Sequence, residues 1–209
     1  MNVLIIGNST DLSRFQQRFP ATNPVVRGHE SEKSCKIAIW FRSSPETDQI
    51  DLAELETEHL FIDSTFQDLS EYKQEFPSKK IYGFTSLPSF FERAVFEVSL
   101  SESTDRTSLE EIMSAWDTEF EIVSDQPGLV TPRVIGMIIN EAFFTAGEGT
   151  ASKEDIDTAM KLGTNYPKGP FEWANDIGIT NVYHLMKSLY ESTGESRYKP
   201  SPLLEEEGS

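Results

Sequence analysis

The chain has 209 residues, of which 37% are hydrophobic and 25% charged, and this composition is typical of a globular protein with one large or two modest domains. Its formal net charge of −17 opposes binding to nucleic acids and to anionic membranes, because both would repel the chain at long range. No apolar run is long enough to cross a bilayer. The single cysteine, Cys35, excludes an internal disulfide framework and favours a cytoplasmic protein.

Short β-branched or aromatic runs alternate with amphipathic stretches over the first 125 residues. Strands that are apolar on both faces and separated by helices predict a trimmed, Rossmann-like doubly wound α/β sheet over residues 1–126. The fold is expected to be trimmed because residues 20–63 leave little room for full crossover helices. Strands are expected at residues 3–7, 24–28, 36–41, 59–63, 80–85, 95–100 and 120–124, and helices at 11–19, 52–56, 66–76 and 108–116.

The pattern then becomes helical, and residues 127–209 are expected to form an all-α domain. Thr131 is a candidate N-cap of the first helix, with a proline directly after it, and Ser152 is a candidate N-cap of the second. The glutamate-rich end, LLEEEGS, is expected to be frayed and solvated. Helices are expected at residues 131–147, 152–163, 170–177 and 179–192.

The expected helix over residues 131–147 is apolar around most of its circumference. A small helical domain can bury only part of such a helix, and soluble proteins rarely expose the remainder. A symmetric homodimer built on the helical domain is the simplest way to cover it. The apolar residues form two neighbouring stripes, Val134, Ile138 and Ala142 in one and Ile135, Ile139 and Phe143 in the other.

The stretch from PGLVTPRVIG through KPSPLL, and above all GTASKEDIDTAMKLGTNYPKGPFEWANDIG, closely resembles the C-terminal domain of the NAD-dependent 3-hydroxyacyl-CoA dehydrogenases of the fatty-acid β-oxidation type. A further resemblance continues back through IYGFTSLPSFFERAVFEVSL. The resemblance implies a Rossmann domain followed by a helical dimerisation domain of the 6-phosphogluconate-dehydrogenase C-terminal-like type. It also implies NAD as cofactor and an acyl-CoA as substrate.

The loop TNYPKGPFEW keeps the pattern of that family, in which the loop lies beside the substrate cleft. The resemblance therefore implies a substrate-cleft role for Tyr166, Pro167, Gly169 and Pro170. The alternative is that the glycine and the prolines only fix a corner between two helices, which a fold would keep after losing its chemistry.

The residues that carry the family's chemistry are largely missing at the matching positions. The family's base is a histidine with a glutamate twelve residues later, and here the histidine position is Thr85 and the glutamate position is Glu97. A threonine hydroxyl does not titrate near neutrality and cannot replace an imidazole. The family's asparagine position is Pro132, and its Ser-Asn-Thr-Ser turn keeps only Ser64 and Thr65. Glu97 is thus either an exposed or paired strand residue, or a relic of the catalytic carboxylate in an open cleft.

The dinucleotide-binding turn is also incomplete. The family's G-x-G-x-x-G follows the first strand, where IIGNSTDL supplies only Gly7, with Ser9 and Leu12 at the other glycine positions. After the second strand, where an acidic residue binds the ribose, the sequence has Arg27 and His29. NAD binding is therefore expected to be weak or absent. The histidines are scattered without metal-ligand spacing, so no metal site is predicted.

Two functions remain open. The first is a pseudoenzyme of this family, retained as a homodimeric binding or structural protein, with an acyl-CoA as a candidate ligand. The second is an active NAD-dependent 3-hydroxyacyl-CoA oxidoreductase that uses Glu97, with water or Thr85 in place of the histidine. The missing histidine and glycines favour the first. The aromatic residues near these positions are expected in the sheet core rather than in an acyl pocket: Phe84, Phe90, Phe91 and Phe96.

Overall fold

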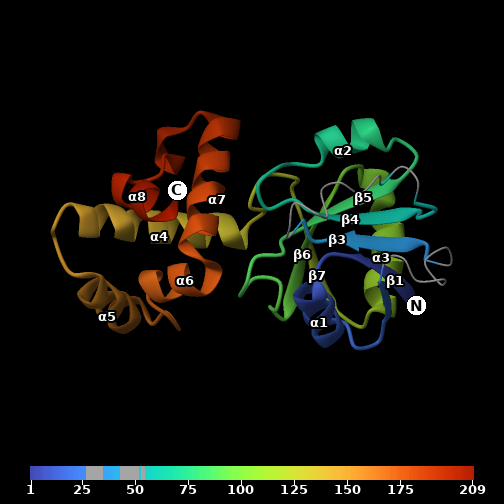
Figure 1. The fold of residues 1–209 in the computed structure, drawn as a ribbon, viewed down its shortest axis with the longest axis horizontal. Helices are drawn as coiled ribbons and strands as arrows, with labels where there is room; N and C mark the ends of the chain where they lie inside the picture. Colours follow the sequence, from blue (N-terminus) through green and yellow to red (C-terminus); the bar gives the residue numbers. More distant parts are fainter. Residues whose placement is uncertain (27–34, 43–51, 53–54) are drawn as a thin grey trace.

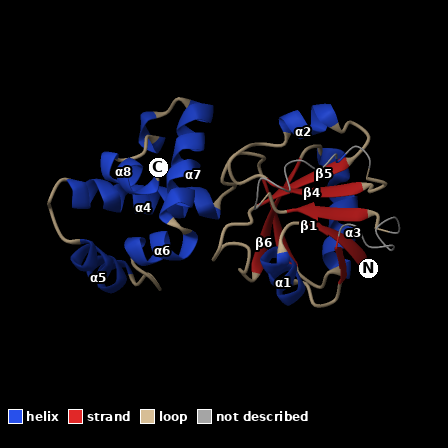
Figure 2. Cartoon of the chain, in the orientation of Figure 1, coloured by secondary structure: helices blue, strands red, loops and turns tan. Residues whose placement is uncertain are grey.

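The computed structural model describes residues 1–26, 35–42, 52 and 55–209. The described strands all lie in the amino-terminal part of the chain, and the carboxy-terminal part contains helices alone (Figure 2). Figure 1 shows the two parts side by side, with α4 beginning at the junction between them. Among the described residues, no helix is long and apolar enough to cross a membrane. The chain thus has the predicted order, an α/β part followed by an all-α part.

The amino-terminal part is a seven-stranded sheet in the order β2-β1-β3-β4-β5-β6-β7. All neighbouring strands are parallel except β5 and β6, which are antiparallel. The strand order reverses at β1, which lies between β2 and β3, and this confirms the doubly wound fold. The strands are β1 (Asn2–Ile6), β2 (Asn23–Val26), β3 (Ile37–Trp40), β4 (His59–Asp63), β5 (Lys80–Phe84), β6 (Val95–Leu100) and β7 (Glu119–Val123). The helices of this part are α1 (Ser9–Arg18), α2 (Ser70–Glu75), the 3-10 turn η4 (Ser103–Asp105) and α3 (Arg106–Ala115).

Each face of the sheet has its own apolar core, because successive side chains of a strand point to opposite faces. Val3 and Ile5 of β1 face the core that contains residues of α1 and α3, whereas Leu4 and Ile6 face the core that contains residues of α2. Trp116, directly after α3, is 1% exposed and lies within the first of these cores. Burial on both faces explains why the strands are apolar runs rather than alternating patterns.

A third core joins the helices of the carboxy-terminal part, and it also takes Leu87 and Phe90 from the loop after β5. The next residue, Phe91, lies in the sheet core instead, so this loop contributes to both parts. The prediction that Phe90 belongs to the sheet core was therefore wrong, because consecutive residues of the loop point in opposite directions. The helices are α4 (Thr131–Gly147), α5 (Lys153–Thr164), α6 (Pro170–Ile177), α7 (Ile179–Thr193), the 3-10 turn η5 (Ser196–Tyr198) and α8 (Pro202–Gly208).

Two predicted helices differ from the structure. The helix expected at residues 66–76 begins only at Ser70. The helix expected at residues 52–56 does not form at its described carboxy-terminal end, since Leu55 and Glu56 are coil, and residues 53–54 lie outside the described residues. The buried ammonium of Lys79 donates to the carbonyl oxygens of Leu55 and Thr57 at 2.7 and 3.0 Å. These hydrogen bonds hold the backbone of this segment in a non-helical conformation.

The glutamate-rich end of the chain was expected to be frayed, and this was wrong. It forms α8, whose N-cap Ser201 accepts a hydrogen bond from the backbone N–H of Leu204 at 3.1 Å. The side chain of Leu204 is fully buried in the helical core. Lys153 of α5 forms an ion pair with Glu207 at 2.7 Å. The signal was present in the sequence as Ser201 followed by a proline, a combination that favours a helix start.

We expect Leu204→Ala to lower the free energy of unfolding by about 2–5 kcal/mol, because it leaves a cavity in the helical core. Glu206→Ala, on the exposed face of the same helix, is the matched control and should change the free energy by less than about 0.5 kcal/mol. Chemical denaturation followed by circular dichroism measures both variants. Equal, small effects for the two would mean that α8 does not pack on the helical domain in solution.

Candidate functional site

The antiparallel register of β5 and β6 brings two predicted site residues together. Gly83 of β5 pairs with Ser99 of β6. Because the strands are antiparallel, the position two residues after Gly83 lies opposite the position two residues before Ser99. Thr85 therefore lies opposite Glu97. The resemblance matches these two positions to the histidine and the glutamate of the family, so the register brings the matched positions together although one residue type differs.

Thr85 and Glu97 line one small cavity together with Thr131 and Pro132 at the start of α4. Pro132 occupies the family's asparagine position, so all three matched positions meet at this point. The cavity volume is about 10 Å³, which is room for at most one water molecule. The remaining lining residues are Phe90, Arg93, Val95 and Phe96. The arrangement in this structure therefore leaves no space for a substrate between the three positions.

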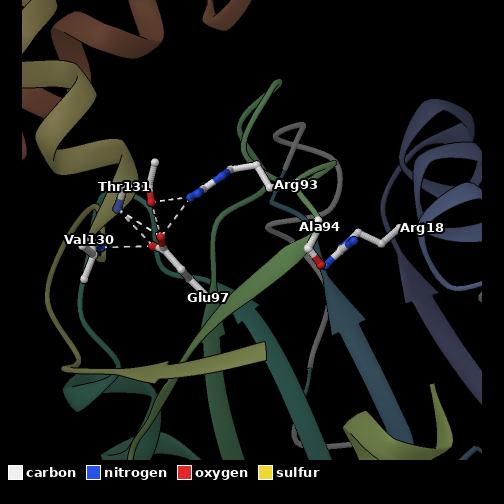
Figure 3. A network of polar contacts seen from close by, with 6 residues as sticks. All are labelled: Arg18, Arg93, Ala94, Glu97, Val130 and Thr131. Atoms are coloured by element: carbon white, nitrogen blue, oxygen red, sulfur yellow. Dashed lines mark hydrogen bonds and ion pairs between the residues drawn. The ribbon is translucent and has the colours of Figure 1, made fainter. Parts of the chain in front are cut away.

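The carboxylate of Glu97 binds the amino-terminal end of α4 (Figure 3). Its Oε2 accepts hydrogen bonds from the backbone N–H groups of Val130 at 3.2 Å and Thr131 at 3.1 Å. Its Oε1 accepts from Nη1 of Arg93 at 3.2 Å and from the hydroxyl of Thr131. A carboxylate at this end of a helix satisfies free N–H groups and interacts favourably with the helix dipole. Glu97, with its side chain 12% exposed, is thus a paired residue.

The N-cap expectation for Thr131 was wrong in one respect. Thr131 is the first residue of α4, and Val130 occupies the N-cap position without making a side-chain cap. The cap comes instead from Glu97, a residue of the sheet. A pattern within the helix sequence could not have shown this, because the capping group is 34 positions away along the chain.

The hydroxyl of Thr85 takes part in a buried relay rather than in a pair with Glu97. Its Oγ1 lies 2.9 Å from Oγ1 of Thr65, and the hydroxyl of Thr65 donates to Oδ1 of Asp63 at 2.5 Å. Because the hydroxyl of Thr65 donates its hydrogen bond to this carboxylate, its oxygen is the acceptor in the hydrogen bond with the hydroxyl of Thr85. Among the hydrogen bonds of the described residues, none joins Thr85 to Glu97.

Asp63, at the end of β4, is a buried polar residue that the sequence reasoning missed. Burial raises the pKa of its carboxyl, while hydrogen bonds from Ser86 and Thr65 act in the opposite direction. The hydroxyl of Ser86 also contacts the carbonyl oxygen of Phe41 at 3.4 Å. The network therefore links the chain segments that follow β3, β4 and β5. An acidic residue at the end of the apolar run HLFI was the available signal.

The loop that the resemblance places beside the substrate cleft forms a corner between α5 and α6. Gly169 is the N-cap of α6, and the buried carboxylate of Asp157 on α5 accepts from the N–H groups of Phe171 at 2.8 Å and Glu172 at 3.1 Å. A Cβ atom on Gly169 would lie 2.2 Å from this carboxylate, so only glycine fits. The close contact gives the glycine a purely structural reason to be present.

The structure does not bring the four loop residues to the cavity of Thr85 and Glu97. Tyr166 packs its ring on Trp173, with 5.4 Å between ring centroids, and Pro167 is exposed. Pro170 lines a different cavity, and none of the four lines the small one. Their substrate-cleft role stays a prediction.

The cavity that includes Pro170 is a largely apolar groove between α4 and α5, with a volume of about 600 Å³. Val134 is 52% exposed, whereas Ile139 and Phe143 of the second expected stripe are fully buried in the helical core. The outward side of α4 is thus offset from the predicted stripes. The other groove residues are Met137, Ile138, Glu141, Ala142, Thr145, Ala151, Asp155, Ile156, Ala159 and Met160.

The turn after β1 does not fit the NAD that the resemblance implies. Gly7 is followed by Asn8, whose side chain caps α1, and the carboxylate of Asp11 lies at the same helix end. Ser9 and Leu12 place side chains where the family has glycines. Arg27 and His29, at the expected ribose-binding position, lie outside the described residues. In the described part of the chain, no three His, Cys, Asp or Glu side chains gather as metal ligands.

Comparison with known proteins identifies the family of the carboxy-terminal part. Residues 128–207 match the family described as 3-hydroxyacyl-CoA dehydrogenase, C-terminal domain. The carboxy-terminal part of the chain, residues 128–207, belongs to this C-terminal domain family. It is 45% identical over 82 residues to 3-hydroxyadipyl-CoA dehydrogenase of Escherichia coli (strain K12), a match covering 39% of this chain and 17% of that protein. It is 41% identical over 99 residues to 3-hydroxybutyryl-CoA dehydrogenase of Clostridioides difficile, a match covering 43% of this chain and 35% of that one.

A solved structure shares the fold over nearly the whole chain. The crystal structure of (S)-3-hydroxybutyryl-CoA dehydrogenase from Ralstonia eutropha superposes with a TM-score of 0.75 at 20% identity, covering 98% of this chain and 92% of that one. At this identity the likeness establishes the fold and not the activity. The matches to the two curated relatives, by contrast, span at most about a third of their lengths.

We expect Glu97→Ala to lower the free energy of unfolding by about 1–3 kcal/mol, because it leaves the N–H groups of Val130 and Thr131 without their acceptor. Glu121→Ala on the neighbouring strand β7 removes the same charge from an exposed position and serves as the control. Denaturant unfolding of the two variants beside the unmodified protein gives the comparison. If both variants lose the same small amount, Glu97 does not cap α4 in solution.

Proposed function

We propose that this chain is a non-catalytic member of the 3-hydroxyacyl-CoA dehydrogenase family that acts as a homodimeric binding or structural protein. The observation that carries the proposal is the state of the catalytic positions. Thr85 stands at the histidine position, the carboxylate of Glu97 is bound to the end of α4, and the space between them holds one water at most.

The chemistry of the family explains why these features matter. Oxidation of a 3-hydroxyacyl group needs a base within hydrogen-bond reach of the hydroxyl and a nicotinamide beside the carbon. Dehydrogenases of this family use NAD. Here the hydroxyl of Thr85 cannot act as the base near neutral pH, and the turn after β1 does not fit the dinucleotide. Loss of the base alone lowers the rate by about 10²–10⁴.

One observation favours the second candidate, an active NAD-dependent oxidoreductase. The hydroxyl of Thr85 connects through Thr65 to the buried carboxyl of Asp63, and such a relay can hold a proton near the cavity. Catalysis by Glu97 would require this carboxylate to leave α4 and the cavity to open. The first candidate requires neither change, and we therefore prefer it.

We expect no turnover of acetoacetyl-CoA with NADH above the blank in an absorbance assay that includes an active 3-hydroxybutyryl-CoA dehydrogenase as positive control. Thr85→His should not restore activity, because Glu97 stays bound to α4 and the cavity lacks room for an imidazole beside a substrate. Measurable activity of the unmodified protein that Glu97→Gln abolishes would establish the second candidate instead.

Two further parts of the proposal concern ligand and location. An acyl-CoA is the ligand class that the family resemblance supports, although the net charge of −17 opposes its phosphates at long range. We propose the cytoplasm as the location, because a single cysteine, Cys35, excludes an internal disulfide framework.

The homodimer is proposed to form through the groove between α4 and α5. Its largely apolar lining would be costly to leave in water, and a second copy can cover it through a symmetric, self-complementary contact. Burial of such a surface contributes several kcal/mol at about 25 cal/mol per Å². The family resemblance supports the same assembly.

Light scattering at micromolar concentration should give about twice the chain mass of 23.6 kDa. Ile138→Asp should shift the mass toward one chain, because Ile138 lines the groove and is only half-buried within the chain. Ile139 is unsuitable for this test because it lies in the helical core. Val134→Asp, on the same helix but outside the groove, is the control. A single-chain mass for the unmodified protein would rule out the homodimer.

A further inference from the structure

The amino-terminal end of α1 carries its own anion. In a dinucleotide-binding turn, the free N–H groups of this helix point at the pyrophosphate of the cofactor. Here the N–H groups of Thr10 and Asp11 donate to Oδ1 of Asn8 at 2.8 and 3.1 Å. The N–H of Asn8 in turn donates to Oδ2 of Asp11 at 2.9 Å. These three N–H groups are therefore satisfied from within the chain.

The one retained glycine serves this carboxylate. Asp11 is 3% exposed, and a Cβ atom on Gly7 would lie 2.7 Å from its Oδ2. Gly7 is not among the glycines with a positive φ, so the turn does not need glycine for its backbone conformation. A glycine stands at this position because the carboxylate of Asp11 approaches the backbone closely.

Leu12 and the two arginines of α1 are also unavailable to a phosphate at the helix start. Leu12 is partly buried against the sheet core, so a packed side chain fills the position of the third glycine. Arg14 forms an ion pair with Glu92 at 2.5 Å, and Arg18 donates to the carbonyl oxygen of Ala94 at 3.3 Å (Figure 3). Both arginines of α1 are thus bound to the segment around β6 rather than directed at the helix start.

We infer that Asp11 is a built-in substitute for the pyrophosphate of a dinucleotide. Its carboxylate lies at the end of α1 and accepts from the N–H of Asn8, whose side chain binds the N–H groups of Thr10 and Asp11; the pair excludes NAD and other diphosphates by like charge and by satisfied N–H groups. The inference rests on the proposed function in treating the chain as non-catalytic, and it gives that loss a specific structural cause.

Calorimetric titration with pyrophosphate, ADP and NADH tests this inference. The unmodified protein should bind each with Kd weaker than about 1 mM. The double variant Asn8→Gly, Asp11→Ser removes the internal anion and its partner, and should bind pyrophosphate at least about tenfold more tightly. Glu119→Ser removes one exposed charge from β7 and should leave binding unchanged. Circular dichroism confirms that each variant is folded. If the double variant is unfolded, Asp11→Asn replaces it, since it keeps the side-chain shape and removes the charge.

Two results would overturn the inference. The first is binding of NADH or pyrophosphate by the unmodified protein with Kd below about 0.1 mM. The second is a folded double variant, or a folded Asp11→Asn, that binds pyrophosphate no better than the unmodified protein. NADH binding without turnover would overturn this inference and leave the proposed function intact. Turnover of acetoacetyl-CoA with NADH would overturn the proposed function, whatever the affinity for pyrophosphate.

Discussion

The carboxylate of Glu97 holds the two parts of the molecule together at the point where the chain passes from one to the other. It lies on β6 and accepts the first N–H groups of α4, the helix on which the carboxy-terminal core is built. The segment that joins the parts has two further attachments. Gly128 donates to the carbonyl oxygen of Thr65, and Asp125 accepts from Leu69 and Ser99. The orientation of α4 on the sheet depends on these contacts, and with it the shape of the small cavity.

The same kind of change recurs at the places where the family binds its ligands. The carboxylate of Glu97, next to the histidine position, is bound to a helix end. At the helix end that faces a pyrophosphate in the family, the side chain of Asn8 accepts from the N–H groups of Thr10 and Asp11, and the carboxylate of Asp11 accepts from the N–H of Asn8. In both cases side chains of the protein itself accept hydrogen bonds from backbone N–H groups at a helix start. Unpaired polar groups at such places would cost free energy, so internal pairing is the physically expected arrangement for the non-catalytic protein proposed above.

The fold was largely predictable because its signals are local or repeat at short range. The apolar runs gave the strands to within about two residues, and the prolines at 132 and 170 gave the starts of α4 and α6. The errors arose where distant residues decide. Lys79 holds the backbone near Leu55 open, Glu97 replaces a local N-cap at Thr131, and Phe90 turns into the helical core. None of these contacts follows from the spacing of neighbouring residues.

The candidate site was predictable only as a set of positions. The family pattern identified Thr85, Glu97 and Pro132 from their spacing, and the register of β5 with β6 explains why they meet. The sequence could not show which partners the polar side chains bind. Thr85 is linked through Thr65 to Asp63, whereas Glu97 binds the start of α4. A dyad needs its two members to face one another, and here they are bound to opposite sides of the cavity. Replacing one residue type would therefore not rebuild the site, since the second member would first have to release the helix that depends on it.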